Sequence, residues 1–169
     1  MIWRILGSIL ICVSCSILGL YFGSRIGRRI EALTALKRSL LLLSHEIEYA
    51  INPIYIAFRN ISLKSSGELR IFYKILADKT EQENELVSVW ERACLGLKLP
   101  IPKEILLEFT NLGKYLNGID KQVQLSAIKM LNTQIDCIIE PLYTEDARER
   151  RLYRGLGVLA GLLIVIILI

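Results

Sequence analysis

The feature that most limits what this chain can fold into is an uncharged, apolar segment at each end. The first runs over twenty residues from Ile5 to Ser24, and the second over fifteen residues from Gly155 to Ile169. All seventeen acidic residues and twenty of the twenty-one Lys and Arg residues lie between Arg25 and Arg154. The sequence therefore predicts a polar middle domain, residues 25–154, flanked by two segments that prefer an apolar environment.

The first apolar segment is long enough to cross a bilayer. As a helix it spans roughly 30 Å, the thickness of one hydrocarbon core, so we predict an N-terminal transmembrane helix at 1–24. A cleaved signal peptide is the alternative, but the stretch is long for one, and no small-residue cleavage site stands out near its end.

The second apolar segment, 155–169, spans only roughly 22 Å as a helix, which is short for a full crossing. A buried core helix is the alternative. A core helix usually keeps one polar stripe, however, and no charged or strongly polar residue follows Arg154. We therefore predict a C-terminal membrane segment, and whether it spans the bilayer or only enters it stays open.

Arginines crowd the polar edge of both segments. Their placement predicts that the middle domain lies in the cytoplasm and that its bases face an anionic bilayer. The same bases account for the net charge of +4, so we expect no nucleic-acid partner. The membrane-flanking bases are Arg25, Arg28 and Arg29 after the first segment and Arg148, Arg150, Arg151 and Arg154 before the second.

Glycines recur four residues apart in both apolar segments, as Gly19 and Gly23 and as Gly157 and Gly161. Glycines at this spacing share one helix face and allow another backbone to approach closely. We predict that these four pack membrane helices together, and a homo-oligomer is left open. Chance is the alternative, because glycine is common in membrane helices.

Apolar residues recur at intervals of three and four throughout the middle domain, which is typical of helices. The first stripe predicts one long helix from about residue 2 to about residue 50, ending before Pro53. Pro141 is predicted to kink the last helix. The fold class is therefore all-α: an antiparallel bundle of about six helices with an N-terminal and a C-terminal membrane helix. The last helix is expected to bury Leu125, Ile128, Leu131, Ile135, Ile138 and Leu142.

Residue patterns for catalysis or metal binding are missing from the sequence. His45 is the only histidine, and Cys12 and Cys15 lie inside the first apolar segment without a second pair. Cys94 and Cys137 fall on predicted apolar helix faces, where buried thiols are ordinary. We predict no catalytic, cofactor-binding or metal site. The acidic run 78–85 is interpreted as a solvated connection, with a docking patch for a basic partner as the alternative.

Four stretches, taken together and in order, resemble the stage III sporulation protein AB family of endospore-forming bacteria. The resemblance covers nearly the whole chain. It implies a component of the channel complex that joins mother cell and forespore, similar to the cytoplasmic helical domains of the inner-membrane platform protein of type II secretion and type IV pilus systems. The stretches are "EIEYAINPI" at 46–54, Trp90, "YLNGIDKQVQ" at 115–124 and the closing "GLGVLAGLLIVIILI".

The resemblance implies that the protein sits in the mother-cell membrane facing the forespore and docks a separate cytoplasmic ATPase, beside other membrane proteins of the complex. We therefore expect a non-enzymatic membrane platform. The alternatives are a membrane-surface regulator that binds anionic lipid through the basic edges, and a membrane-anchored enzyme with an unrecognised site.

Four residues are candidate partner contacts. Glu46, Tyr49 and Asn52 lie near the predicted corner between the first two helices of the middle domain, and Asp120 lies in a predicted turn. The competing interpretation is that Tyr49 packs and Glu46 forms an ordinary helix pair. Asp120 is expected to cap the next helix first, with any docking role second.

Overall fold

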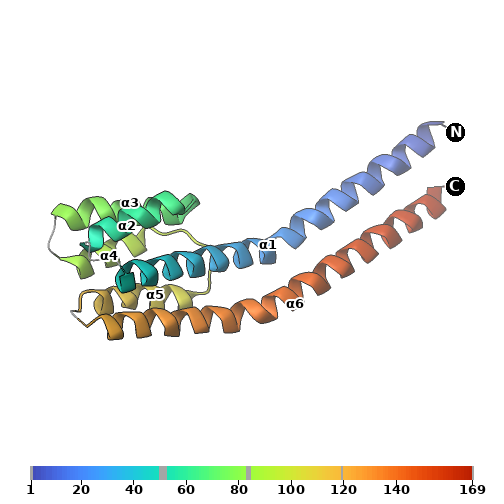
Figure 1. Ribbon diagram of the computed structural model, residues 1–169. Helices are drawn as coiled ribbons and strands as arrows, with labels where there is room; N and C mark the ends of the chain where they lie inside the picture. The colour runs from blue at the N-terminus through green and yellow to red at the C-terminus, as the bar shows by residue number, and fades with distance from the viewer. Residues whose placement is uncertain (1, 50–52, 83–84, 119, 169) are drawn as a thin grey trace. The chain divides into compact units, whose positions relative to one another are not determined.

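The structure is a computed structural model, and it describes the backbone at residues 2–49, 53–82, 85–118 and 120–168 (Figure 1). Side chains are described for 26–49, 53–82, 85–118 and 120–148. Helices account for the regular structure in these ranges, and six of them follow one another along the chain. The predicted all-α fold with about six helices is confirmed.

Two long helices and four short ones make up the chain. Helix α1, Ile2–Tyr49, is a single helix of 48 residues, as the uninterrupted apolar stripe predicted. Helix α6, Lys121–Leu168, is equally long. The short helices are α2 Ile54–Lys64, α3 Gly67–Gln82, α4 Leu86–Leu95 and α5 Lys103–Leu116.

The chain divides into two compact units. One holds residues 1–30 together with 140–169, and the other holds residues 31–139. The second unit is the helical bundle, in which α2 packs on α3, α3 on α4 and α4 on α5 (Figure 1). Two prolines separate helices of this bundle. Pro53 and Pro102 immediately precede α2 and α5, and their extended backbone ends the preceding segment before the next helix begins.

The bundle core forms where the apolar stripes meet. Leu33, Leu36, Leu40 and Leu43 of α1 are all fully buried, at the three- and four-residue spacing that one helix face requires. An aromatic cluster fills the space among the short helices. Phe72 lies 5.2 Å from Trp90 and 5.3 Å from Phe109 between ring centroids, distances at which edge and tilted ring contacts are favourable.

Two expectations for α6, the burial of its apolar face and the burial of Cys137, need correction. Ile128, Leu131 and Ile135 are buried as predicted, whereas Leu125, Ile138 and Leu142 are only half-buried. Ile139 is buried in place of Ile138, so the apolar stripe lies one residue further on than predicted near Cys137. Cys137 is exposed rather than buried, because it falls on the outer face that this shift creates. Helix α6 continues through Pro141, where Thr144 Oγ1 donates a hydrogen bond to the Pro141 carbonyl at 2.7 Å, and the kink at Pro141 stays a prediction.

Of the two predicted membrane segments, 1–24 and 155–169, residues 2–24 belong to α1 and residues 155–168 to α6, and both segments lie outside the residues whose side chains are described. Within the described part of the chain, no helix is long and apolar enough to cross a membrane. The two segments therefore stay predictions.

Candidate functional site

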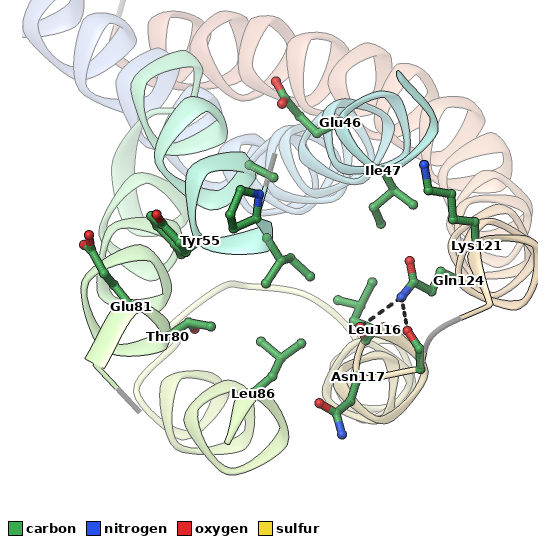
Figure 2. Close-up of a pocket in the computed structure, with 14 residues that line it drawn as sticks. Glu46, Ile47, Tyr55, Thr80, Glu81, Leu86, Leu116, Asn117, Lys121 and Gln124 are labelled. Atoms are coloured by element: carbon green, nitrogen blue, oxygen red, sulfur yellow. Dashed lines mark hydrogen bonds between the residues drawn. The ribbon is translucent and has the colours of Figure 1, made fainter. Parts of the chain in front are cut away.

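A pocket of about 540 Å³ opens at one end of the bundle, within the range of volumes that ligand sites occupy (Figure 2). Its position follows from the antiparallel order of the helices, because the ends of α1, α3 and α5 meet the starts of α2, α4 and α6 there. Ile47, Thr80 and Leu116 come from the helix ends, and Ile54, Leu86 and Lys121 come from the helix starts.

The wall between α5 and α6 is held by Gln124. Its side-chain amide donates to the carbonyl oxygens of Leu116, at 3.0 Å, and Gly118, at 2.6 Å (Figure 2). Leu116 is the last residue of α5, where carbonyls lack partners within the helix, and Gly118 lies in the turn just beyond it. The burial of Gln124 is therefore structural: from the first turn of α6, its side chain pairs with backbone carbonyls where α5 ends.

Asp120 caps α6, as its place in the turn predicted. Its Oδ1 accepts a hydrogen bond from the backbone N–H of Gln122 at 2.8 Å, the bond that an N-cap side chain makes. Asp120 itself is exposed. It does not line the pocket but fixes the start of the helix that carries Lys121 and Gln124.

Charged groups of both signs lie around the pocket. Glu46 of α1 is half-buried and accepts a hydrogen bond from the Asn60 side chain of α2 at 3.2 Å. Glu81 of α3 pairs with Arg59 of α2 at 2.9 Å, and both side chains are about half exposed. Lys121 is exposed. The pocket thus combines two carboxylates and one ammonium with an apolar wall.

One lining group has an unused hydrogen-bonding capacity. The Thr80 hydroxyl oxygen is buried and has no hydrogen-bond partner within the described residues. A buried hydroxyl normally finds a partner, because leaving it unpaired costs free energy. At the pocket wall it is available to a polar group that enters from outside.

The candidate partner contacts are separated by the structure. Glu46 lines the pocket. Tyr49 is 68% exposed, and its ring packs beside the His45 ring, with centroids 4.9 Å apart. Asn52 lies outside the described residues. The turn at Asp120 and the corner at Glu46, far apart along the chain, are brought to the same end of the bundle.

Of the membrane-flanking bases, Arg28, Arg29 and Arg148 are exposed. The other four flanking arginines and all four predicted packing glycines lie outside the residues whose side chains are described. The affected residues are Arg25, Arg150, Arg151, Arg154, Gly19, Gly23, Gly157 and Gly161.

Two titratable groups of the described bundle, Cys94 and Tyr73, are buried. Burial raises the pKa of the Cys94 thiol to about 12, with an opposing hydrogen bond to Thr110. Burial likewise raises the pKa of the Tyr73 hydroxyl, which donates to Ser39 Oγ at 3.2 Å. A thiol held protonated is a poor nucleophile. Across the described residues, no group of three or more His, Cys, Asp or Glu side chains could hold a metal ion.

Fold and site together define a small helical-bundle protein that presents an open, mixed-charge pocket where its helix ends meet. Residues 4–169 match the stage III sporulation protein AB family, so the chain belongs to that family and has a role in sporulation. The stage III sporulation protein AB of Bacillus subtilis (strain 168) is 25% identical over 174 residues, covering 98% of each chain.

The fold also matches a solved structure of a stage III sporulation protein AB, with a TM-score of 0.63. The match covers 71% of this chain and 97% of that one at 18% identity, so it bears on the fold alone. Both relatives carry the name of a sporulation protein, which is not the name of an enzyme.

Proposed function

We propose that this protein is a non-enzymatic platform of the mother cell–forespore channel complex that docks a separate cytoplasmic ATPase at the end-of-bundle pocket. Both chain ends hold it in the mother-cell membrane facing the forespore, with the bundle in the cytoplasm. One observation carries the proposal. The stretches 46–54 and 115–124, which carry the family resemblance, contribute most of the lining of a single pocket although about sixty residues separate them.

The pocket suits a protein partner better than a small substrate. Its charged groups, Glu46, Glu81 and Lys121, are half-buried or exposed and come from three different helices. Partly solvated charges around an apolar wall guide orientation and association of a partner more than they contribute to chemistry.

Lys121→Glu is the sharpest test. Lys121 is the first residue of α6, where a positive charge opposes the helix dipole, so the change to Glu favours the helix and lost binding cannot be ascribed to unfolding. We expect the full-length variant, in mild detergent, to bind the purified ATPase at least ten-fold more weakly than the unchanged protein.

Lys103→Glu is the matched control, because Lys103 is exposed, opens α5 and does not line the pocket. It should bind the ATPase normally. Equal binding by both variants would place the docking surface elsewhere, and no binding by the unchanged protein would remove the ATPase from the proposal.

A second candidate, a membrane-surface regulator, is favoured by the exposure of Arg28, Arg29 and Arg148. Such bases attract anionic lipid. Replacing all seven flanking arginines with Gln should alter lipid dependence but leave ATPase binding intact if the platform function holds. Loss of function with unchanged ATPase binding would favour the regulator.

A further inference from the structure

A trough runs along the bundle surface between α5 and α6, away from the pocket already described. It consists of two hollows of about 710 and 430 Å³ that share three lining residues, Glu108, Met130 and Gln134. No residue lines both this trough and the end-of-bundle pocket. It is therefore a second, separate surface of the same bundle.

Large apolar side chains of the trough are exposed. Leu107 is 62% exposed and Met130 64%, and Tyr115 and Val123 are about half exposed. Single exposed apolar side chains are normal, but neighbouring ones in one concave surface mark an interaction site. Met130 adds an adaptable surface, because its unbranched side chain adjusts to different shapes.

The charges of the trough have one sign. Glu104 and Glu108 lie one helical turn apart on α5, and no Lys or Arg is among the residues that line either hollow. This pattern disfavours an anionic lipid surface, and it disfavours a symmetric contact with a second copy, which would oppose the same carboxylates. It favours a partner that brings positive charge.

The length of the trough suits a short helix. The lining residues run from Glu104 to Tyr115 on α5 and from Gln122 to Ile138 on α6. At 1.5 Å per residue these stretches measure roughly 16 and 24 Å, the length of a helix of about 11 to 16 residues. A trough of this shape between two helices suits an amphipathic helix laid along it.

We propose that this trough binds a basic amphipathic helix of a partner protein. Apolar residues on one face of that helix pack on Leu107 and Met130. Lys or Arg side chains spaced one turn apart pair with Glu104 and Glu108. This docking is independent of the ATPase pocket, so either can fail without the other.

The test uses the full-length protein in nanodiscs of zwitterionic lipid and a fluorescein-labelled 16-residue helical peptide. The peptide carries Leu at i, i+4, i+7 and i+11 and Lys at two flanking positions one turn apart. A control peptide carries Glu in place of these Lys residues. Fluorescence anisotropy, corrected for empty nanodiscs, should show the Lys peptide binding at least ten-fold more tightly, with an affinity that falls as salt is added.

Two variants locate the binding. Met130→Asp should weaken binding of the Lys peptide at least ten-fold, and the double change Glu104→Gln with Glu108→Gln should weaken it several-fold and remove most of its salt dependence. Leu63→Asp is the matched control, because Leu63 is 74% exposed on α2, outside the trough. It should bind the peptide normally, as should Lys121→Glu.

Three results would overturn the proposal. Equal binding of the Lys and Glu peptides would remove the role of the two carboxylates. Equal weakening by Leu63→Asp and Met130→Asp would show that binding does not use the trough. Self-association that is lost in Met130→Asp, measured by sedimentation, would make the trough an interface between copies of the chain.

Discussion

At the scale of single residues, the tightest constraint in the bundle lies between Gly113 and Trp90. Trp90 is fully buried, and its indole N–H donates to the Phe109 carbonyl at 2.9 Å, which fixes the ring. A Cβ added at Gly113 would lie 2.5 Å from Trp90 Cδ1. Glycine is therefore required here for close approach, although it costs helix propensity.

Gly113→Ala should destabilise the bundle by about 1–3 kcal/mol, because the ring must move off its buried position. Gly96→Ala is the control, since an added Cβ there meets only the Ala93 carbonyl oxygen, at an ordinary 3.6 Å. Urea unfolding measures both, with Trp90 as the only tryptophan in a Trp3→Phe background. Equal stability of the two Ala variants would contradict the packing described.

Alkaline pH should weaken the bundle through Cys94 and Tyr73. The folded pKa of each is raised by burial above its unfolded value, to about 12 for Cys94, so the folded state keeps protons that the unfolded chain releases. Stability is fully present below about pH 8.5 and falls as pH rises, first through Cys94 and above about pH 10 also through Tyr73.

The dependence of the unfolding free energy on pH measures this effect, and each group contributes a slope of up to about 1.4 kcal/mol per pH unit. Cys94→Ala should remove the slope between about pH 8.5 and 10, and above about pH 10 it should leave only the shallower fall that Tyr73 contributes. An unchanged slope in this variant would mean that Cys94 is not the group responsible.

At the scale of elements, the turn between α5 and α6 holds both helices. Gln124 satisfies the carbonyl of Leu116, the last residue of α5, and that of Gly118 in the turn, and Asp120 satisfies an N–H at the start of α6. Asp120→Ala should cost about 1 kcal/mol of stability, and Asp120→Asn should cost much less, because the amide oxygen also caps. Urea unfolding of the two variants measures the difference.

Binding of the ATPase by Asp120→Ala separates the two roles of this residue. The capping role predicts that affinity changes little under conditions where the variant is folded. A large loss of affinity at unchanged stability would show that Asp120 serves mainly as a contact for the ATPase rather than as a helix cap.

The limits of the helices could be predicted closely from the sequence, and the residues that each helix buries could be predicted less well. The apolar stripe of α1 and the prolines at 53 and 102 mark helix limits by local chemistry. The stripe of α6 is off by one residue near Cys137, because a periodicity of 3.6 leaves neighbouring residues such as Ile138 and Ile139 equally eligible for the core. Burial of Gln124 depends on the carbonyls of another helix, which no local pattern reveals.

At the scale of the whole molecule, the pocket could be predicted only in part. Glu46 was predicted as a partner contact, and Thr80 and Glu81 were included only in the acidic run 78–85, whose alternative interpretation was a docking patch. Their convergence with Lys121 was not predicted, because these residues meet only once the helices alternate in direction. The short turns between helices could have indicated this convergence. They make neighbouring helices antiparallel, so the end of one helix and the start of the next lie at the same end of the bundle.

Membrane anchoring carries its own prediction. Gly23→Leu or Gly161→Leu should lower self-association or function without preventing insertion, because the larger side chain separates helices but stays apolar. Crosslinking of the full-length protein in membranes measures the first effect, and fractionation measures the second. A crosslinking pattern unchanged by either substitution would remove these glycines from the interface.

The central claim is that the protein is a platform for a cytoplasmic ATPase. The most direct measurement is capture of the full-length protein, in mild detergent, from cells making spores, after crosslinking, with Lys121→Glu and Lys103→Glu captured in parallel. The account predicts that the ATPase and other membrane proteins of the channel complex accompany the unchanged protein and Lys103→Glu, and that the ATPase is lost from Lys121→Glu. Capture of the unchanged protein alone would contradict it.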